Sequence, residues 1–236
     1  MPVISFVSPK GGVGKSTSAL LLATELAHKG LGVTVIDGDP EQWINRWAAR
    51  GNVPATMRVV SQPSEETIID AIESAAAETP FVIVDLEGTA NMVVAYAISR
   101  SNLVVIPTQA STMDGQSAAK AIKLVKQQER GFSRRIPFAV LFTRTSAAIK
   151  SRLERDLETQ MLDSNVPVFQ TQLLERSAYR SIFDYACPLE QLPRSVSNLD
   201  KAITNARAFA GEVLAMCKLN KADLPSNAAK ADEVAA

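Results

Sequence analysis

A short segment near the start of the chain combines the residue types that bind phosphate. Residues 9–17 read PKGGVGKST, and glycine backbone can wrap closely around an anion and point its N–H groups inward. The Lys15 ammonium adds a full positive charge, and the Ser16 hydroxyl suits Mg²⁺. The spacing predicts a phosphate-binding loop, and the residues expected to contact a nucleotide are Gly11, Gly12, Val13, Gly14, Lys15, Ser16 and Thr17.

The segments on either side of this loop fit that function. Residues 3–7 form an apolar run that predicts a buried strand, and apolar residues between 18 and 28 recur at helical spacing. A strand, a glycine-rich turn with Gly-Lys-Ser and a helix are the context in which this motif binds nucleotide phosphate. A dinucleotide fingerprint would need the spacing GxGxxG, which the glycines at 11, 12 and 14 do not have.

Acidic residues end two other apolar runs in the first half of the chain. Residues 33–36 lead into Asp37 and Asp39, and residues 81–84 lead into Asp85. Because ligands of a parallel sheet bind beyond the carboxyl ends of its strands, Asp85 is expected to orient Mg²⁺ beside the phosphates. At each of the three positions, an aspartate that only caps the turn after a strand is the alternative interpretation.

The phosphate loop resembles the deviant Walker A motif, KGGxGK[ST], of the ParA/MinD family of ATPases. The Gly that opens the ordinary motif is replaced by Pro9, and a second lysine, Lys10, follows it. In this family that lysine reaches across a nucleotide-sandwich dimer to the partner's phosphates. The resemblance therefore implies that Lys10 and Lys15 both contact ATP as catalytic groups, and that hydrolysis is coupled to formation of a homodimer on ATP binding.

The resemblance extends to the acidic residues. Residues 37–40, Asp-Gly-Asp-Pro, are similar to the second Walker element (Walker A′) of ParA-type proteins, which implies that Asp39 positions or activates the attacking water. The family commonly has Gln directly after the Pro, whereas Glu41 intervenes before Gln42 here. The cofactors implied are ATP and Mg²⁺, and the residues implied in metal binding are Ser16, Asp37, Asp39 and Asp85.

Similarity to this family covers residues 2–215. The segment 101–108, with Ser111 and Asp114, is similar to the stretch that follows the Walker B strand. Thr143 and Arg144 lie where the family places adenine contacts, and residues 171–176 lie where a loop covers the base. The chain looks most like compact plasmid-partition ParA proteins (ParF-like), and nearly as much like the VirC-type ATPases of conjugative DNA transfer.

Positive charge is concentrated in the second half of the chain. Residues 1–117 contain 7 Lys or Arg and 12 Asp or Glu, whereas residues 118–236 contain 18 and 13. The helix predicted at 113–130 carries four cations. At about 100° per residue, their side chains project within an arc of about 120° around the helix axis. A second group of cations begins the next helix. Such clusters bind nucleic-acid phosphates without reading sequence, although a solvated helix face is the alternative. The candidate residues for nonspecific double-stranded DNA are Lys120, Lys123, Lys126, Arg130, Lys150, Arg152 and Arg155.

The composition fits an ordinary soluble protein, with 46% hydrophobic residues and a formal net charge of zero over 236 residues. No run of 18 or more uncharged apolar residues is present, so no membrane association is expected. Cys187 and Cys217 lack the spacing of a metal site, and the single histidine, His28, leaves no histidine-based catalysis. These observations favour the cytoplasm. The resemblance implies a bacterial protein, which DNA binding would associate with the nucleoid.

Apolar runs and helical stretches alternate along the whole chain. Ser64 is expected to cap a helix at 65–77. The alternation predicts the α/β class, as a P-loop NTPase whose largely parallel, twisted sheet has helices on both faces. Residues 1–219 are expected to form one ATPase domain, and 220–236 a disordered tail. The other predicted strands are 33–37, 58–60, 81–85, 103–107, 136–143 and 166–170, and the other helices are 42–50, 113–130, 151–162, 176–185 and 198–218.

The residues and the resemblance together favour an ATP-driven switch. ATP binding would form a dimer that holds DNA nonspecifically. Slow hydrolysis, stimulated by DNA and a small centromere-binding (ParB-like) adaptor, would release that DNA and so segregate or position plasmid or chromosomal DNA. A VirC-like role with conjugative transfer proteins would use the same nucleotide chemistry.

Two functions of another class also occur on this fold. A small-molecule kinase or an ATP-dependent ligase on the same fold remains an alternative, although the sequence marks no substrate pocket for one. An electron-transfer ATPase resembling the nitrogenase iron protein is excluded, because residues 86–186 contain no cysteine to hold a cluster.

Overall fold

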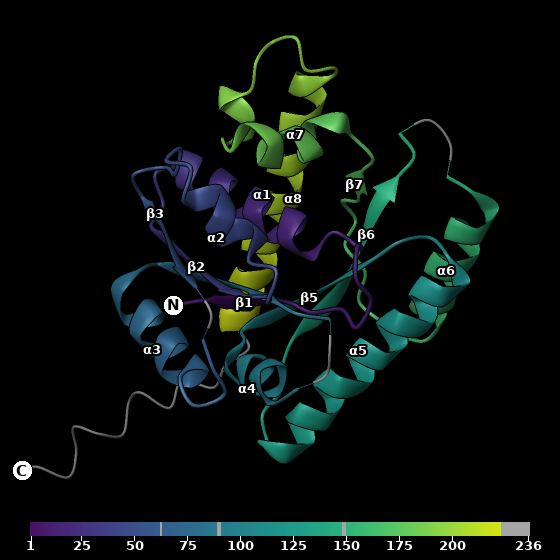
Figure 1. Ribbon diagram of the computed structural model, residues 1–236. Coiled ribbons are helices and arrows are strands. Elements are labelled where there is room, and N and C mark those ends of the chain that lie inside the picture. Colours follow the sequence, from purple (N-terminus) through teal and green to yellow (C-terminus); the bar gives the residue numbers. More distant parts are fainter. Residues whose placement is uncertain (62, 89–90, 148–149, 223–236) are drawn as a thin grey trace, which may run out of the picture.

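In the computed structural model, which describes residues 1–61, 63–88, 91–147 and 150–222, seven strands form one parallel sheet (Figure 1). The strand order is β3-β2-β4-β1-β5-β6-β7, so β1 lies at the centre between β4 and β5. Because the strands are parallel, their carboxyl ends meet at one edge, where such sheets bind ligands. The strands are β1 (Val3–Phe6), β2 (Val33–Gly38), β3 (Met57–Ser61), β4 (Phe81–Leu86), β5 (Leu103–Thr108), β6 (Phe138–Thr145) and β7 (Leu173–Leu174).

Helices cover both faces of this sheet (Figure 1). One face packs against α1 (Lys15–His28), α2 (Trp43–Ala48), α7 (Ser177–Tyr185) and α8 (Leu199–Ala222). The other packs against α3 (Ile68–Glu78), α4 (Met92–Arg100), α5 (Thr112–Gly131) and α6 (Arg152–Asp163). A short 3-10 helix, Leu189–Gln191, joins α7 to α8.

The two cores explain why the central strands are apolar throughout. Successive side chains of a strand point to opposite faces, so Ile4 and Phe6 of β1 enter the core beneath α1 while Val3 enters the other. A strand that is covered on both faces needs apolar residues at every position, rather than at alternate ones. The α/β fold with a parallel sheet predicted from the sequence is therefore confirmed.

One predicted strand is wrong. Residues 166–170 do not form a strand, because within them Val168 makes only an isolated bridge to Val140. Pro167 has no N–H to donate, and its carbonyl instead accepts a hydrogen bond from the Val140 amide. The edge strand next to β6 is β7, which lies inside the segment predicted as a loop over the base.

Two helix predictions also need correction. Ser64 does not cap α3: its N–H donates to the Thr67 hydroxyl within a turn, and the helix begins only at Ile68. Helix α4 has no counterpart among the predicted elements. The Asn91 side chain caps it by accepting from the Val94 amide, and its nine residues are too few for a strong periodic signal.

The last helix is longer than predicted, because α8 continues to Ala222, past the expected domain boundary at 219. From residue 223, the tail predicted at 220–236 lies outside the described residues. None of the helices in the described part of the chain is long and apolar enough to cross a membrane.

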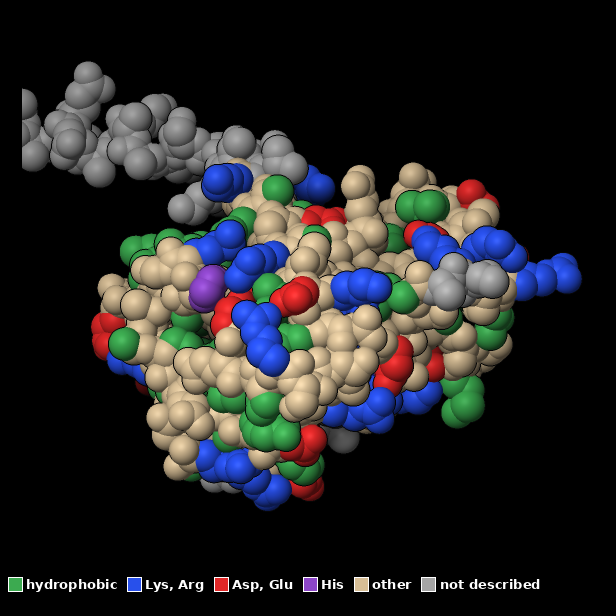
Figure 2. Space-filling view, turned by 90° about the horizontal axis from the view of Figure 1, so that it is seen from above, with side chains coloured by type: hydrophobic (Ala, Val, Ile, Leu, Met, Phe, Trp, Pro, Cys, Tyr) green, Lys and Arg blue, Asp and Glu red, His purple; other side chains and the backbone are tan. Residues whose placement is uncertain are grey.

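A charged cluster joins α1 to α8 on the face shown in Figure 2. The buried Glu25 carboxylate lies 3.5 Å from the Arg207 guanidinium, which also contacts Glu190 at 3.1 Å. Arg207 lies 3.3 Å from a ring nitrogen of His28, the purple side chain in the figure. Burial, reinforced by the charge of Glu190, raises the pKa of Glu25 to about 7. Near neutral pH this carboxyl group is therefore partly protonated.

Candidate nucleotide-binding site

The loop between β1 and α1 presents backbone N–H groups to the carboxyl edge of the sheet. Gly12 and Gly14 have φ angles of 75° and 92°, in the left-handed region that favours glycine. Gly14 is also the N-cap of α1 and has no side chain with which to cap the first turn. The N–H groups at this helix start can therefore bind an anion. Helix α1 begins at Lys15, earlier than predicted, so Lys15, Ser16 and Thr17 form its first turn.

Side chains at the ends of neighbouring strands donate hydrogen bonds to the carbonyl groups of this loop. The Thr143 hydroxyl, at the end of β6, donates to the Val13 carbonyl at 2.7 Å and lies 3.1 Å from the Thr108 carbonyl. Gln109, just after β5, donates its side-chain amide to the Gly12 carbonyl at 3.0 Å. Thr143 was predicted as an adenine contact, and this geometry gives it a further role in fixing the backbone of the phosphate loop.

Asp85 is the last but one residue of β4 and lies beside the loop. In the sheet it is level with Phe6 on one side and with Asp37 on the other. Its carboxylate is fully buried, and neither oxygen has a hydrogen-bond partner of good geometry among the described residues. Burial raises the pKa of Asp85 to about 7, although the nearby Ser16 hydroxyl and Lys15 ammonium act in the opposite direction. A buried carboxylate without partners needs a cation or a proton.

Asp37 and Asp39 shape the turn after β2. The two Asp37 oxygens accept hydrogen bonds from the Asn45 amide at 2.8 Å and the Asp39 amide at 3.3 Å. Burial raises the pKa of Asp37, and these two hydrogen bonds oppose that shift. Asp39 is half-buried, and its Oδ1 accepts from the Glu41 amide at 2.9 Å. Asp37 thus ties the turn to the start of α2, while Asp39 faces the cavity described below.

The site fits a magnesium ion held by few protein groups. Among residues 1–61, 63–88, 91–147 and 150–222, no group of three or more His, Cys, Asp or Glu side chains is arranged to hold a metal. Mg²⁺ keeps several waters and is usually bound by one or two protein groups together with substrate phosphates. The Ser16 hydroxyl and the unpartnered Asp85 oxygens could supply such groups. Asp37, whose oxygens already accept two amides, is less available.

Lys10 is held within its own subunit. Its ammonium lies 2.8 Å from Oδ1 of Asp114, and the Lys10 side chain is 35% exposed while that of Asp114 is 2% exposed. Asp114 lies in the first turn of α5, where the Ser111 hydroxyl hydrogen-bonds its other carboxylate oxygen. Lys10 therefore stands beside the phosphate loop without lining the cavity over it.

A cavity of about 680 Å³ opens over the phosphate loop. Its volume suits a cofactor or a small-molecule substrate. The loop forms the floor, Asp39 and Trp43 form one wall, and Arg180 and Phe183 of α7 form another. The two walls are joined, because the Trp47 indole donates to the Ile182 carbonyl and the Arg50 guanidinium to the Phe183 carbonyl, each at 3.0 Å.

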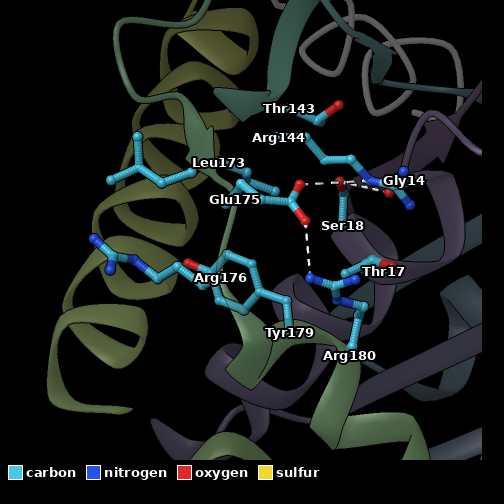
Figure 3. A pocket seen from close by; sticks show the side chains of 11 residues that line it. Gly14, Thr17, Ser18, Thr143, Arg144, Leu173, Glu175, Arg176, Tyr179 and Arg180 are labelled. Carbon is cyan, nitrogen blue, oxygen red and sulfur yellow. Dashed lines mark hydrogen bonds and ion pairs between the residues drawn. The ribbon is translucent and has the colours of Figure 1, made fainter. Parts of the chain in front are cut away.

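A smaller cavity of about 50 Å³ continues from the loop toward β7 (Figure 3). Figure 3 shows the Glu175 carboxylate between the side chains of Arg144 and Arg180, at 3.9 and 3.2 Å. Arg144 has a φ of 52°, a left-handed conformation that is strained for arginine. The predicted base contacts Thr143 and Arg144 and the predicted base-covering segment thus meet around one pocket.

The two predicted basic groups differ in their ion pairs. Lys120, Lys123, Lys126 and Arg130 lie exposed along α5. In the second group, Lys150 pairs with Glu158 at 2.8 Å and Arg152 lies 3.8 Å from Asp156. Arg155 is exposed on α6. The group on α6 is therefore partly neutralised, whereas the group on α5 is exposed.

Sequence reasoning did not identify the wall formed by α7. Arg180 and Phe183 reach the cleft only because α7 packs against α2, and no local pattern predicts that contact. The pairing of Lys10 with Asp114 was missed for the same reason, although both residues had been singled out.

Comparison with known sequences gives consistent results. The family model described as VirC1 protein matches residues 1–210. A relative described as Protein ParA, from Rhizobium radiobacter, is 38% identical over 210 residues, which cover 89% of this chain and 95% of the relative. A protein described as virC1, from Rhizobium rhizogenes, is 27% identical over 187 residues, which cover 77% of this chain and 80% of the relative.

Solved structures share the fold. An ATP complex of McdA from Cyanothece has a TM-score of 0.68 at 16% identity, covering 89% of this chain and 96% of that one. The cell division ATPase MinD of Pyrococcus furiosus has a TM-score of 0.68 at 18% identity, covering 91% of this chain and 99% of that one. At these identities the likeness shows the fold alone, which is the predicted P-loop NTPase fold.

Proposed function

This chain belongs to the VirC1 family of ParA-type ATPases, and on that premise we propose that it is an ATP-dependent switch for moving DNA. ATP binding would form a homodimer that binds double-stranded DNA nonspecifically. Hydrolysis of ATP to ADP and phosphate would release the DNA, and repeated cycles would segregate or position plasmid or chromosomal DNA. The relative described as Protein ParA, at 38% identity, supports this version most directly.

The position of Lys10 is the main structural observation in favour of the dimeric switch. Lys10 stands next to the phosphate loop on an accessible surface, and its ammonium pairs with Asp114 instead of lining its own cavity. From that place it could reach the phosphates of a second subunit facing the loop. There it would act like an arginine finger, which in related phosphoryl-transfer enzymes contributes a factor of about 10³–10⁵ in rate.

The other site residues would each have a separate role in hydrolysis within one subunit. The loop N–H groups and Lys15 would bind the phosphates, and Asp39 would orient the attacking water from the wall of the large cavity. Mg²⁺ bound near Ser16 and Asp85, with Asp37 behind, would neutralise charge on the phosphoryl oxygens. The base would enter beside Arg144, and Glu175 would have to move, since a cavity of about 50 Å³ is too small for a purine.

DNA and an adaptor protein would control this cycle. The exposed cations of α5 offer a surface for DNA phosphates, and a small centromere-binding (ParB-like) protein would stimulate an otherwise slow ATPase. The protein would act in the bacterial cytoplasm in association with the nucleoid. A second candidate function is conjugative DNA transfer, because the matching family model and a 27% identical relative are both described as VirC1. In that case transfer proteins would replace the adaptor.

An ATPase assay with the Lys10→Ala variant tests the proposal. We expect the chain to hydrolyse ATP slowly with Mg²⁺ and faster with duplex DNA and the adaptor. Lys10→Ala should still bind ATP, remain a monomer and lose the stimulated rate by about 10³-fold, because it lacks the cation supplied across the dimer. Lys201→Ala, an exposed lysine on α8, is the matched control and should behave as the wild type.

Other results would contradict parts of the proposed function. A Lys10→Ala protein that dimerises and hydrolyses ATP at the wild-type rate would remove the role across the dimer. Hydrolysis that requires a small acceptor molecule would indicate a kinase or ligase. Equal DNA affinity with ADP and with ATP would contradict a switch, and stimulation by transfer proteins alone would favour the VirC-like role.

A further inference from the structure

We propose that Asn205 of α8 is a positioning residue for the nucleotide base, although its own side chain does not line the cavity that the base would enter. This inference rests on the nucleotide site proposed above and adds which part of the fold determines the affinity for the base. Asn205 would act through residues 172–176, called here the pocket strand. This segment contains β7, and its last four residues line the smaller cavity.

The Asn205 carboxamide bonds to the backbone of the pocket strand on both sides of Leu173. Its Nδ2 donates to the Gln172 carbonyl at 2.8 Å, and its Oδ1 accepts from the Leu174 amide at 3.0 Å. β7 is the last of the described strands in the sheet, so none of the others covers its outer edge. Because a carboxamide has the same donor and acceptor as a peptide group, Asn205 takes the place of a neighbouring strand at this edge.

Two more side chains of α8 hold the chain just before the pocket strand. The two Glu212 oxygens accept hydrogen bonds from the amides of residues 170 and 171, at 2.7 and 2.8 Å. The Phe209 ring packs edge-to-face against Phe169, with 5.7 Å between the ring centroids. At about 100° per residue, these two side chains and Asn205 project within an arc of about 60° around the helix axis. One face of α8 therefore makes all of these contacts.

Tyr179 connects this face of α8 to the cavity itself. Its side chain is among those that line the cavity in Figure 3, and its hydroxyl lies 3.0 Å from Oδ1 of Asn205. The same hydroxyl lies 3.1 Å from the Ala202 carbonyl. Burial raises the pKa of Tyr179, so the hydroxyl keeps its proton and can donate to either oxygen. Asn205 thus contacts both the pocket strand and a side chain of the cavity wall.

The phosphate loop is held by other contacts. The carbonyls of Gly12 and Val13 accept hydrogen bonds from Gln109 and Thr143, which lie at the ends of β5 and β6. A change on α8 is therefore expected to disturb the base pocket while the phosphate loop keeps its shape. This separation predicts that Asn205 affects the affinity for the base and leaves the affinity for the phosphates unchanged.

Binding of ADP and of pyrophosphate distinguishes the two parts of the site. ADP carries a base and two phosphates, whereas pyrophosphate carries the two phosphates alone. Isothermal titration of the full chain in the presence of Mg²⁺ gives the dissociation constant of each. For Asn205→Ala, we expect the dissociation constant of ADP to rise about tenfold, because two hydrogen bonds to the pocket strand are lost. The dissociation constant of pyrophosphate should stay within about twofold of the wild-type value.

A matched control and a second variant accompany this experiment. Thr204 is exposed on α8, and its hydroxyl donates to the Asp200 carbonyl of the same helix. Thr204→Ala should therefore bind both ligands as the wild type does. Should Asn205→Ala fold poorly by circular dichroism, Glu212→Gln gives the same test. It keeps the shape of the side chain but places an NH₂ group against one of the two amides, and the dissociation constant of ADP alone should rise about threefold.

The outcomes separate this inference from the proposed function. Wild-type affinity for ADP in a folded Asn205→Ala variant would overturn the inference and leave the proposed function standing. Equal weakening of ADP and pyrophosphate would also overturn it, because Asn205 would then support the whole site instead of the base pocket. A wild type that binds ADP no more tightly than pyrophosphate would remove the base pocket and the inference with it. Binding of neither ligand to the wild type would reject both the nucleotide site and the inference.

Discussion

In the dimer proposed above, Lys10 would have to leave Asp114 before it could reach the phosphates of the partner subunit. Asp114 is 2% exposed, so the departure of Lys10 would leave a buried carboxylate without its cation. Removing one partner of a buried ion pair is unfavourable, because the remaining charge stays desolvated. The pair would therefore hold the single subunit in its monomeric form and make ATP-dependent dimerisation less favourable than the phosphate contacts alone would allow.

The Asp114→Asn substitution tests this competition. The neutral amide keeps the shape of the side chain but does not hold Lys10 by charge, so we expect the ATP-bound dimer to form at lower concentration. The dissociation constant of the dimer should fall about tenfold, which corresponds to about 1.4 kcal/mol. Sedimentation with a non-hydrolysable ATP analogue measures it, and Asp163→Asn, an exposed aspartate ending α6, is the control. An unchanged or weaker dimer would show that Asp114 does not compete for Lys10.

At the scale of helices, Gly115 of α5 lies against Leu157 of α6. A Cβ at this position would lie 2.7 Å from Cδ1 of Leu157, which is too close for two carbons. In a helix interior, alanine is more favourable than glycine by about 1 kcal/mol. We expect Gly115→Ala to show none of this gain in the wild type, and to show it when Leu157 is also replaced by alanine.

A double-mutant cycle by denaturant unfolding measures the coupling. The free energies of unfolding of Gly115→Ala, Leu157→Ala and the double variant should be non-additive by about 1 kcal/mol. Additivity within about 0.3 kcal/mol would mean that Leu157 moves aside without cost. The result matters for function, because α5 carries both Asp114 and the exposed cations proposed to contact DNA.

The strength of the local pattern decided which elements were predictable. The phosphate loop and the apolar strands around it have sequence signals that need no tertiary information, and Asp85 follows from its place at a strand end. Helix α4 and strand β7 are short, with nine and two residues, and give little periodicity to detect. The α7 wall of the cleft and the Lys10–Asp114 pair depend on packing between distant segments, which no local pattern contains.

At the scale of the whole molecule, the free energy of unfolding is expected to depend on pH through the cluster that joins α1 to α8. The pKa of Glu25 is about 7 in the fold, against an ordinary value of 4.5. A raised pKa means that the folded state holds the proton more tightly than the unfolded chain. This contribution to stability is therefore complete below pH 4.5 and is lost as pH rises through about 7. It amounts to at most about 3 kcal/mol.

The Glu25→Gln variant isolates this effect, because glutamine stays neutral at every pH. Denaturant unfolding between about pH 5 and about pH 8.5 should show the wild type losing stability relative to the variant, by at most about 3 kcal/mol. Glu65→Gln, an exposed position before α3, serves as the control and should follow the wild-type curve. Parallel curves for wild type and Glu25→Gln would contradict the raised pKa.

The central place of β1 in the sheet has a consequence for how the protein is made. β1 pairs with β4 and β5, so Val3 lies opposite Val82 and Ile4 opposite Leu103. At about 5–20 residues per second, a ribosome needs about 5–20 s to synthesise the roughly 100 residues that separate β1 from the end of β5. Until β4 has been made, β1 has no partner strand, and its second edge stays unpaired until β5 follows. The central sheet of this protein therefore cannot assemble until nearly half of the chain has been made.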